Sequence, residues 1–350
     1  MPATKPDVLP PIDVGAWFRG GAKIQGSDPK KLNDWKLDWA YAELHAGGKI
    51  HKNVAITVNL NASMADYNQG GAFVGLEDAI IQFDFIDEFH LWVGHLLVMA
   101  DRANSAGPFF AIPWNFYPGT FAAPATPHEG PTGRSNGAVV WGDIAKGKLT
   151  YIVGAYDNGN AVGIPATGTT PAVPGSSPLF SGRLRLSLLD EEPGFWGNSS
   201  YFGDKDIFSI GLGGQYQKDG STSGMKNWME FNADLLFEKK LGGGSFVTAE
   251  AGYDHFGDDD GTPSDLVYAL VAFATGTMGY GNLQPMARFQ FEKIKSVAGV
   301  SPPSPWSVDA GLAYLIKGPA LRVIANYMHT KIDDNASANA IQFGAQAIFF

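Results

Sequence analysis

Residues 53–65 read NVAITVNLNASMA. Apolar residues occupy every second position from Val54 to Met64, and Asn, Thr, Ser and Ala fill the positions between them. Because successive side chains of a strand point to opposite faces, this pattern predicts a strand with one apolar and one polar face. The alternation persists for about twice the 5 to 6 residues of an average strand in a globular protein.

The same alternation recurs along the chain. In residues 180–188 the apolar side chains oppose Arg183 and Arg185, and in residues 229–238 they oppose Glu230 and Asp234. Three segments, 35–47, 88–98 and 264–276, have apolar residues on both faces. Reading the whole chain in this way predicts about sixteen strands, at residues 14–26, 35–47, 52–65, 75–86, 88–98, 137–145, 148–157, 179–189, 205–217, 226–239, 244–256, 264–276, 282–294, 305–316, 320–331 and 338–350.

Long strands with little charge favour a membrane protein built from strands. Charged residues make up 17% of the chain, below the ~25% of soluble domains. No apolar run reaches the ~18 residues of a membrane-spanning helix, whereas strands of about 9 to 11 residues suffice. Tight connections such as 146–148 alternate with longer ones such as 156–178, and only Asp190–Lys205 breaks the alternation.

These features predict an all-β fold, a closed antiparallel transmembrane barrel that forms a single domain over residues 1–350. We expect residues 1–13 to form an N-terminal segment on the periplasmic side. The start, Met1 to Thr4, lacks a charged region followed by an apolar core, so we expect a mature form without its signal peptide. The alternative is a soluble sandwich or propeller, which also alternates but needs no strands of this length.

Other function classes lack their residues. A net charge of −10 without any basic run excludes nucleic acid as a partner. The chain has no cysteine, which excludes disulfides and thiolate chemistry. The acidic run Gly257–Gly261 lacks the spacing of a calcium loop and is interpreted as a solvated outer loop. We expect no metal, no cofactor and no catalytic residue.

The segment between the fifth and sixth predicted strands is unusually long. Loops beyond about 12 to 15 residues are uncommon unless they are functional. Residues 99–135 are rich in Gly, Pro and aromatic side chains. We expect this segment to fold into the barrel as a constriction that sets pore width more than charge selectivity. Its candidate residues are Asp101, Arg102, Trp114, Glu129 and Arg134, with Asp101 and Glu129 as local partners of the two arginines.

Charges on the inward phase of the strands are the other candidates, because a passive pore needs only a narrow wet passage and an electrostatic barrier. Barrel closure brings the predicted strands of Arg19, Lys23, Arg288 and Arg322 onto one wall, which predicts a basic patch and anion preference if that wall dominates. Opposed rows of charge would create a transverse field. The further inward candidates are the cations Arg183 and Arg185 and the acids Asp78, Asp84, Glu230 and Asp234.

Three short motifs resemble a known family. Residues 90–95 followed by Asp101-Arg102, residues 200–206 (SYFGDKD) and residues 283–288 (LQPMAR) are similar to porins related to the phosphate-selective porin O and P group, particularly deltaproteobacterial-type members. The aromatic end, Ile348 to Phe350, is similar to the last strand of bacterial outer-membrane porins. In that strand Gln342 and Gln346 share a face with Phe350, so the phase of Phe343 and Phe349 is the alternative lipid-facing one.

The resemblance implies a sixteen-stranded trimeric channel in the lipid of the bacterial outer membrane, with its third outer loop folded inward. It implies passive diffusion of small hydrophilic solutes and ions. Two alternatives stay open: a barrel that encloses an electron-transfer cytochrome, and an outer-membrane hydrolase. The chain itself has no Cys-x-x-Cys-His haem motif and no Ser and His pair in a hydrolase motif.

Overall fold

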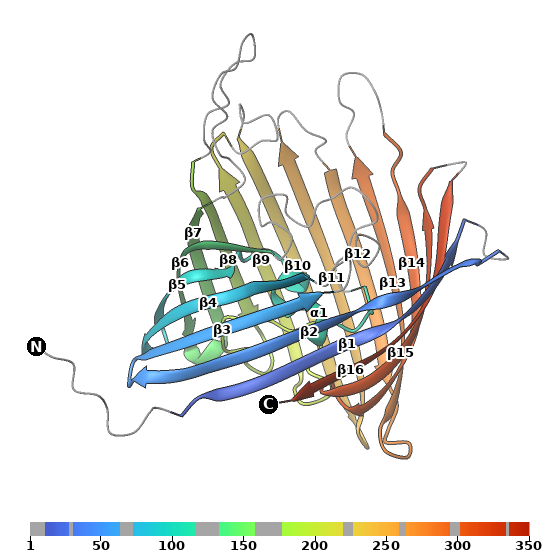
Figure 1. Cartoon of the computed structure of the whole chain (residues 1–350), viewed down its shortest axis with the longest axis horizontal. Helices are drawn as coiled ribbons and strands as arrows, with labels where there is room; N and C mark the ends of the chain where they lie inside the picture. Colours follow the sequence, from blue (N-terminus) through green and yellow to red (C-terminus); the bar gives the residue numbers. More distant parts are fainter. Residues whose placement is uncertain are drawn as a thin grey trace, which may run out of the picture.

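The structure is a computed structural model. It describes residues 11–27, 31–63, 73–115, 133–157, 177–219, 227–258, 264–294, 302–333 and 336–349. In these residues sixteen strands pair in sequence order, all antiparallel, and the last strand pairs with the first. The sheet is therefore a closed barrel, as Figure 1 shows.

The strands have bounds close to those predicted, and the largest difference is at β2, which ends at His51 and not at residue 47. In chain order the elements are β1 (Asp13–Gly26), β2 (Asp34–His51), β3 (Val54–Ser63), β4 (Phe73–Ile86), β5 (Phe89–Leu97), α1 (Arg102–Phe110), β6 (Arg134–Ile144), η2 (Ala145–Gly147), β7 (Leu149–Asp157), β8 (Leu179–Ser187), β9 (Ile207–Gln217), β10 (Trp228–Gly242), β11 (Ser245–Asp258), β12 (Ser264–Ala274), β13 (Asn282–Ile294), β14 (Trp306–Lys317), β15 (Leu321–Lys331) and β16 (Ser337–Phe349).

The outer face of the barrel is apolar and the inner face is polar. On β10, Phe231 is 47% exposed whereas its neighbour Asn232 is fully buried. On β16, Phe343 and Phe349 are exposed whereas Gln342 and Gln346 are buried, which confirms the phase with Phe343 and Phe349 outward. A soluble protein has the opposite arrangement, so this outer surface is suited to lipid.

Two of the strands with apolar residues on both faces have a packing reason for this pattern. The inner face of β12 places Leu270 and Ala272 against Ile112, a residue that follows α1. The end of β5 contributes Leu96 and Leu97 to a second buried apolar cluster. These positions are apolar because they are buried against other protein segments. Within the described ranges, no helix is both long and apolar enough to cross a membrane.

Candidate functional site

The segment after β5 contains a short helix that the sequence analysis did not predict. The Asp101 carboxylate caps α1 by accepting a hydrogen bond from the Asn104 N–H at 2.7 Å. The helix is interrupted at Gly107, whose φ of 61° favours glycine, and Pro108 follows. The described part of the segment, up to Asn115, is thus a capped turn of helix followed by a bend.

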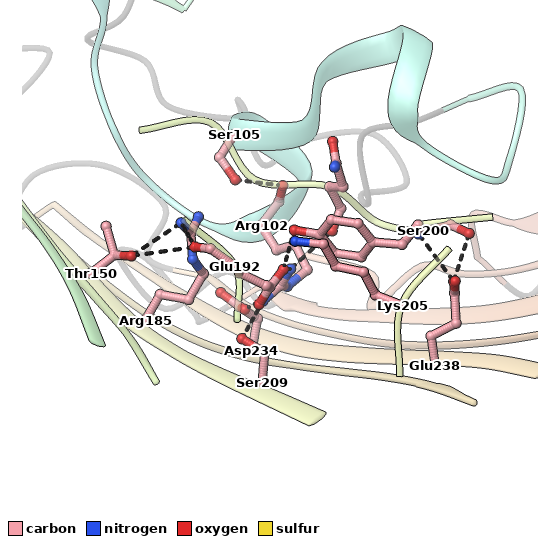
Figure 2. A network of polar contacts seen from close by, with 12 residues as sticks. Arg102, Ser105, Thr150, Arg185, Glu192, Ser200, Lys205, Ser209, Asp234 and Glu238 are labelled. Carbon is pink, nitrogen blue, oxygen red and sulfur yellow. Dashed lines mark hydrogen bonds and ion pairs between the residues drawn. The ribbon is translucent and has the colours of Figure 1, made fainter. Parts of the chain in front are cut away.

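Arg102 attaches the start of α1 to the barrel wall. It is fully buried, and its five N–H groups all donate. It forms a bidentate pair with Glu192 at 3.0 and 3.2 Å, contacts Asp234 of β10 at 3.1 Å and donates to the Ser209 hydroxyl of β9 at 2.9 Å. The fifth bond goes to the Asn198 carbonyl. Figure 2 shows Arg102 together with Glu192, Asp234 and Ser209. Full pairing of this kind is what makes a buried guanidinium tolerable.

Glu192 lies in residues 188–206, the connection whose length broke the predicted alternation. This connection joins β8 to β9 at the barrel end where the tight turns lie. Arg185 of β8 donates to the carbonyls of Glu192, Gly194 and Trp196 at 2.6, 2.7 and 3.3 Å. The connection is long because it folds against inward-facing side chains (Figure 2).

The second half of this connection is held by Glu238 of β10. The Glu238 carboxylate accepts from the Ser200 hydroxyl at 2.7 Å and from the N–H groups of Tyr201 and Gly203 at 3.1 and 2.8 Å. The Tyr201 hydroxyl also donates to Glu192 at 2.8 Å. The SYFGDKD motif thus belongs to the structure that supports the Arg102 pair.

The charge states of Glu192, Arg102 and Asp101 follow from their burial and pairing. Burial opposes ionisation of Glu192, but the Arg102 guanidinium outweighs it and lowers the pKa of Glu192 to about 2. Burial also opposes the charge of Arg102, yet Glu192 and Asp234 raise its pKa further above the ordinary value. Burial raises the pKa of Asp101 to about 6, although the Asn104 N–H acts in the opposite direction. The Arg102–Glu192 pair is therefore ionised at neutral pH.

Further along the described part of the segment, residues 109–114 are bonded to the opposite side of the barrel. Arg19 of β1 donates to the Trp114 carbonyl, and its guanidinium lies 4.1 Å from the Trp114 ring centre. Arg322 of β15 donates to the Ile112 carbonyl at 3.3 Å, and Gln346 of β16 donates to the Phe109 carbonyl at 2.8 Å. These strands lie across the ring from β8–β10.

Other predicted residues fall into ion pairs. Arg183 contacts Asp234 at 2.6 Å and donates to the Ala100 carbonyl at 3.0 Å, so it joins the Arg102 network. Arg288 pairs with Asp309 of β14 at 2.9 Å, so its charge is balanced by a neighbour that the sequence analysis did not consider. Of the four residues of the expected basic patch, Arg19 and Arg322 donate to the α1 segment, whereas Arg288 is paired with Asp309.

The expected local partners are also different. Arg102 hydrogen-bonds to Glu192 and Asp234 and not to Asp101. Arg134 contacts Glu77 at 3.1 Å and Asp78 at 3.3 Å, and Glu129 lies outside the described residues. The remaining candidates are placed as follows: Lys23 pairs in register with Gln342, Asp84 contacts His90 and Trp92, and Glu230 accepts from Asn232.

Glu77 is a residue that the sequence analysis missed. Strict alternation allows either Glu77 or Asp78 to face inward, and Asp78 was the one predicted. The register between β3 and β4 shifts here, because Asn59 pairs with Asp78 whereas Leu60 pairs with Leu76. This β-bulge lets both carboxylates reach Arg134.

A cavity of about 740 Å³ lies between α1 and the wall formed by β1–β4. Its aromatic wall includes Trp17, Phe109 and Phe110, with ring centres of Trp17 and Phe109 5.1 Å apart. Its charged lining residues are Asp13, Glu43, Glu77, Asp78 and Arg134, with His45 beside Glu43.

No cluster of three His, Asp or Glu side chains suited to a metal ion occurs in the part of the chain that the structure describes. The acidic run at Gly257–Gly261 extends beyond the described residues after Asp258.

The fold has solved counterparts, although no family model and no curated protein matches the chain. OprB of Pseudomonas putida matches with a TM-score of 0.61 at 11% identity, over 97% of this chain and 94% of that chain. An anion-selective porin from Comamonas acidovorans gives a TM-score of 0.59 at 12% identity, over 97% and 100%. The trimer form of OmpT, an outer membrane protein of Vibrio cholerae, gives 0.58 at 10% identity, over 97% and 99%. The chain therefore has a porin-like fold.

Proposed function

We propose that this chain forms a water-filled channel in the bacterial outer membrane, through which small hydrophilic solutes and ions diffuse passively. The observation that carries the proposal is the closed barrel with an apolar outer face, a polar inner face and a cavity of about 740 Å³ inside. Such a barrel is stable in lipid because every strand pairs on both sides. The polar interior then offers a path for water.

The constriction in this proposal is the segment of residues 99–135. Its described part is bonded to β8–β10 through Arg102 and Arg183 and to β1, β15 and β16 through Arg19, Arg322 and Gln346. A segment attached to both sides of a ring narrows it. The constriction is therefore supported by bonds that run from this segment to opposite sides of the barrel. The bulk of Trp114 contributes to the narrowing.

The proposal includes a homotrimer in outer-membrane lipid and kinship with the phosphate-selective porin O and P group. Support for the trimer is the trimer form of OmpT among the structural counterparts. Support for the kinship is the resemblance of the SYFGDKD motif, whose Ser200 and Tyr201 donate to Glu238 and Glu192 in the structure. The whole chain would act as one domain, with residues 1–13 on the periplasmic side.

The interior bears on the cytochrome alternative and on the expected charge preference. A barrel that encloses a cytochrome needs an unobstructed interior, whereas residues 100–115 are bonded to both sides of this one. Anion preference was expected from a basic wall, but Arg19 and Arg322 hold backbone carbonyls of the α1 segment and do not line the cavity. The geometry favours a channel whose charge preference is set by residues other than Arg19 and Arg322.

A liposome swelling assay tests the channel. Liposomes containing the folded chain are diluted into isotonic solutions of sugars of increasing size. We expect rapid swelling with the smallest sugars and progressively slower swelling with larger ones, because the α1 segment limits the width. Liposomes with heat-denatured protein are the control. Swelling no faster than this control for every sugar would contradict the proposal.

A further inference from the structure

The cavity between α1 and β1–β4 points to the kind of ion that passes. We propose that ions cross the barrel through this cavity and that the channel prefers cations to anions. The inference rests on the channel function proposed above and adds the substrate class to it. It reverses the preference expected from the sequence.

The first argument is the charge of the cavity lining. Among the described lining residues the carboxylates are Asp13, Glu43, Glu77 and Asp78, and Arg134 is the one guanidinium. Arg134 contacts two of these carboxylates and His45 lies 3.0 Å from a third, Glu43, so the four carboxylates outnumber the basic side chains of the lining. A narrow passage with low-dielectric walls focuses such a field and concentrates counter-ions, which here are cations.

The second argument is where the other arginines lie. Arg102 and Arg183 are paired with acids, and Arg19 and Arg322 are bonded to backbone carbonyls of the α1 segment. None of the four lines the cavity. Arg19 and Arg322, two of the four residues behind the expected anion preference, therefore hold the α1 segment in place. The charged side chains that line the cavity are mainly carboxylates.

The third argument is the aromatic part of the lining, which points to cations independently of the acids. Trp17, Phe109, Phe110 and Trp196 line the cavity, and ring faces attract cations. The guanidinium of Arg134 already lies 5.9 Å from the ring centre of Trp196. An anion entering the same space would meet the carboxylates and would gain no such attraction from the rings.

The test is the reversal potential of the full chain in planar bilayers under a KCl gradient. We expect K⁺ to be severalfold more permeant than Cl⁻. Glu43→Gln and Asp78→Asn should each shift the permeability ratio toward Cl⁻, and Arg134→Gln should shift it further toward K⁺. The opposite directions guard against a general loss of structure, which would move all three variants in the same sense.

Glu292→Gln is the matched control. Glu292 is also a fully buried carboxylate on a strand, but it does not line the cavity. The K⁺ to Cl⁻ permeability ratio should be unchanged by this substitution. An anion-preferring wild type, or a shift with Glu292→Gln that equals the shift with Glu43→Gln, would overturn the inference while leaving the channel intact. Absence of any conductance would instead overturn the channel function itself.

Discussion

At the scale of single residues, the buried Arg102 guanidinium is the strongest link between α1 and the barrel. Arg102→Met leaves Glu192 buried without its bidentate partner, which for a buried ion pair costs about 3 to 5 kcal/mol. The matched control is Lys239→Met, which breaks an exposed pair with Asp206 and should cost less than about 1 kcal/mol. Urea unfolding in detergent micelles, followed by tryptophan fluorescence, measures both. Equal costs for the two variants would show that Arg102 is not an anchor.

The Arg102–Glu192 pair also has a defined pH dependence. The pKa of Glu192 falls from its ordinary 4.5 to about 2 on folding, which corresponds to about 3 kcal/mol of stability. Since the folded pKa is the lower one, this stability is present above pH 4.5 and is lost as the pH falls through 2. Asp101, whose pKa is raised, acts in the opposite direction. Comparing wild type with a Glu192 variant removes this contribution, because Asp101 is present in both proteins.

We therefore expect the difference in unfolding free energy between wild type and Glu192→Gln to be constant above about pH 5 and to shrink toward pH 2. Urea titrations of both proteins at a series of pH values measure it. A difference that does not change between pH 7 and pH 2.5 would contradict the ionised pair.

At the scale of elements, the position of the α1 segment depends on space left by a glycine. A Cβ added at Gly344 of β16 would lie 2.1 Å from the Trp114 ring, whereas one added at Gly182 of β8 has its nearest neighbour at 3.9 Å. We expect Gly344→Ala to displace Trp114 and increase single-channel conductance, and Gly182→Ala to leave it unchanged. Tryptophan emission should shift in the first variant alone. A conductance that is the same in both would separate Trp114 from the width of the channel.

The elements also show what the sequence can predict. All sixteen strands were predicted, most of them from period-2 alternation, which is a local property of a single strand. The inward turn of residues 188–206 was not, because the Arg102–Glu192 contact joins residues 90 positions apart. Its only trace in the sequence was a connection too long for its place. Glu77 was missed for a different reason, since a β-bulge interrupts the alternation on which the prediction relied.

At the scale of the whole molecule, the account places lipid against one face of every strand. The chain has no cysteine, so a single introduced cysteine carries a unique fluorescent label. Val271 and Ala272 are neighbours on β12, with exposed fractions of 52% and 2%. A label at Val271→Cys should be quenched by a lipid-phase quencher and a label at Ala272→Cys should not. Equal quenching at the two positions would contradict the orientation of the strands.

The whole-molecule prediction from the sequence was accurate about the wall and less so about the interior. Closure of sixteen strands follows from alternation and from the absence of a free sheet edge, whereas for β16 alternation left two phases open and the structure decides between them. The partners of inward charges do not, because they depend on register across strands. Arg288 illustrates this, since Asp309 lies opposite it in the β13–β14 ladder and balances its charge.

The central claim is that the barrel conducts through an interior narrowed by the α1 segment. Single-channel recording of the full chain in planar bilayers in symmetric KCl tests it most directly. We expect discrete, repeated conductance steps from protein that is folded as judged by its β-sheet circular dichroism. Folded protein that inserts into the bilayer and gives no conductance steps would contradict it.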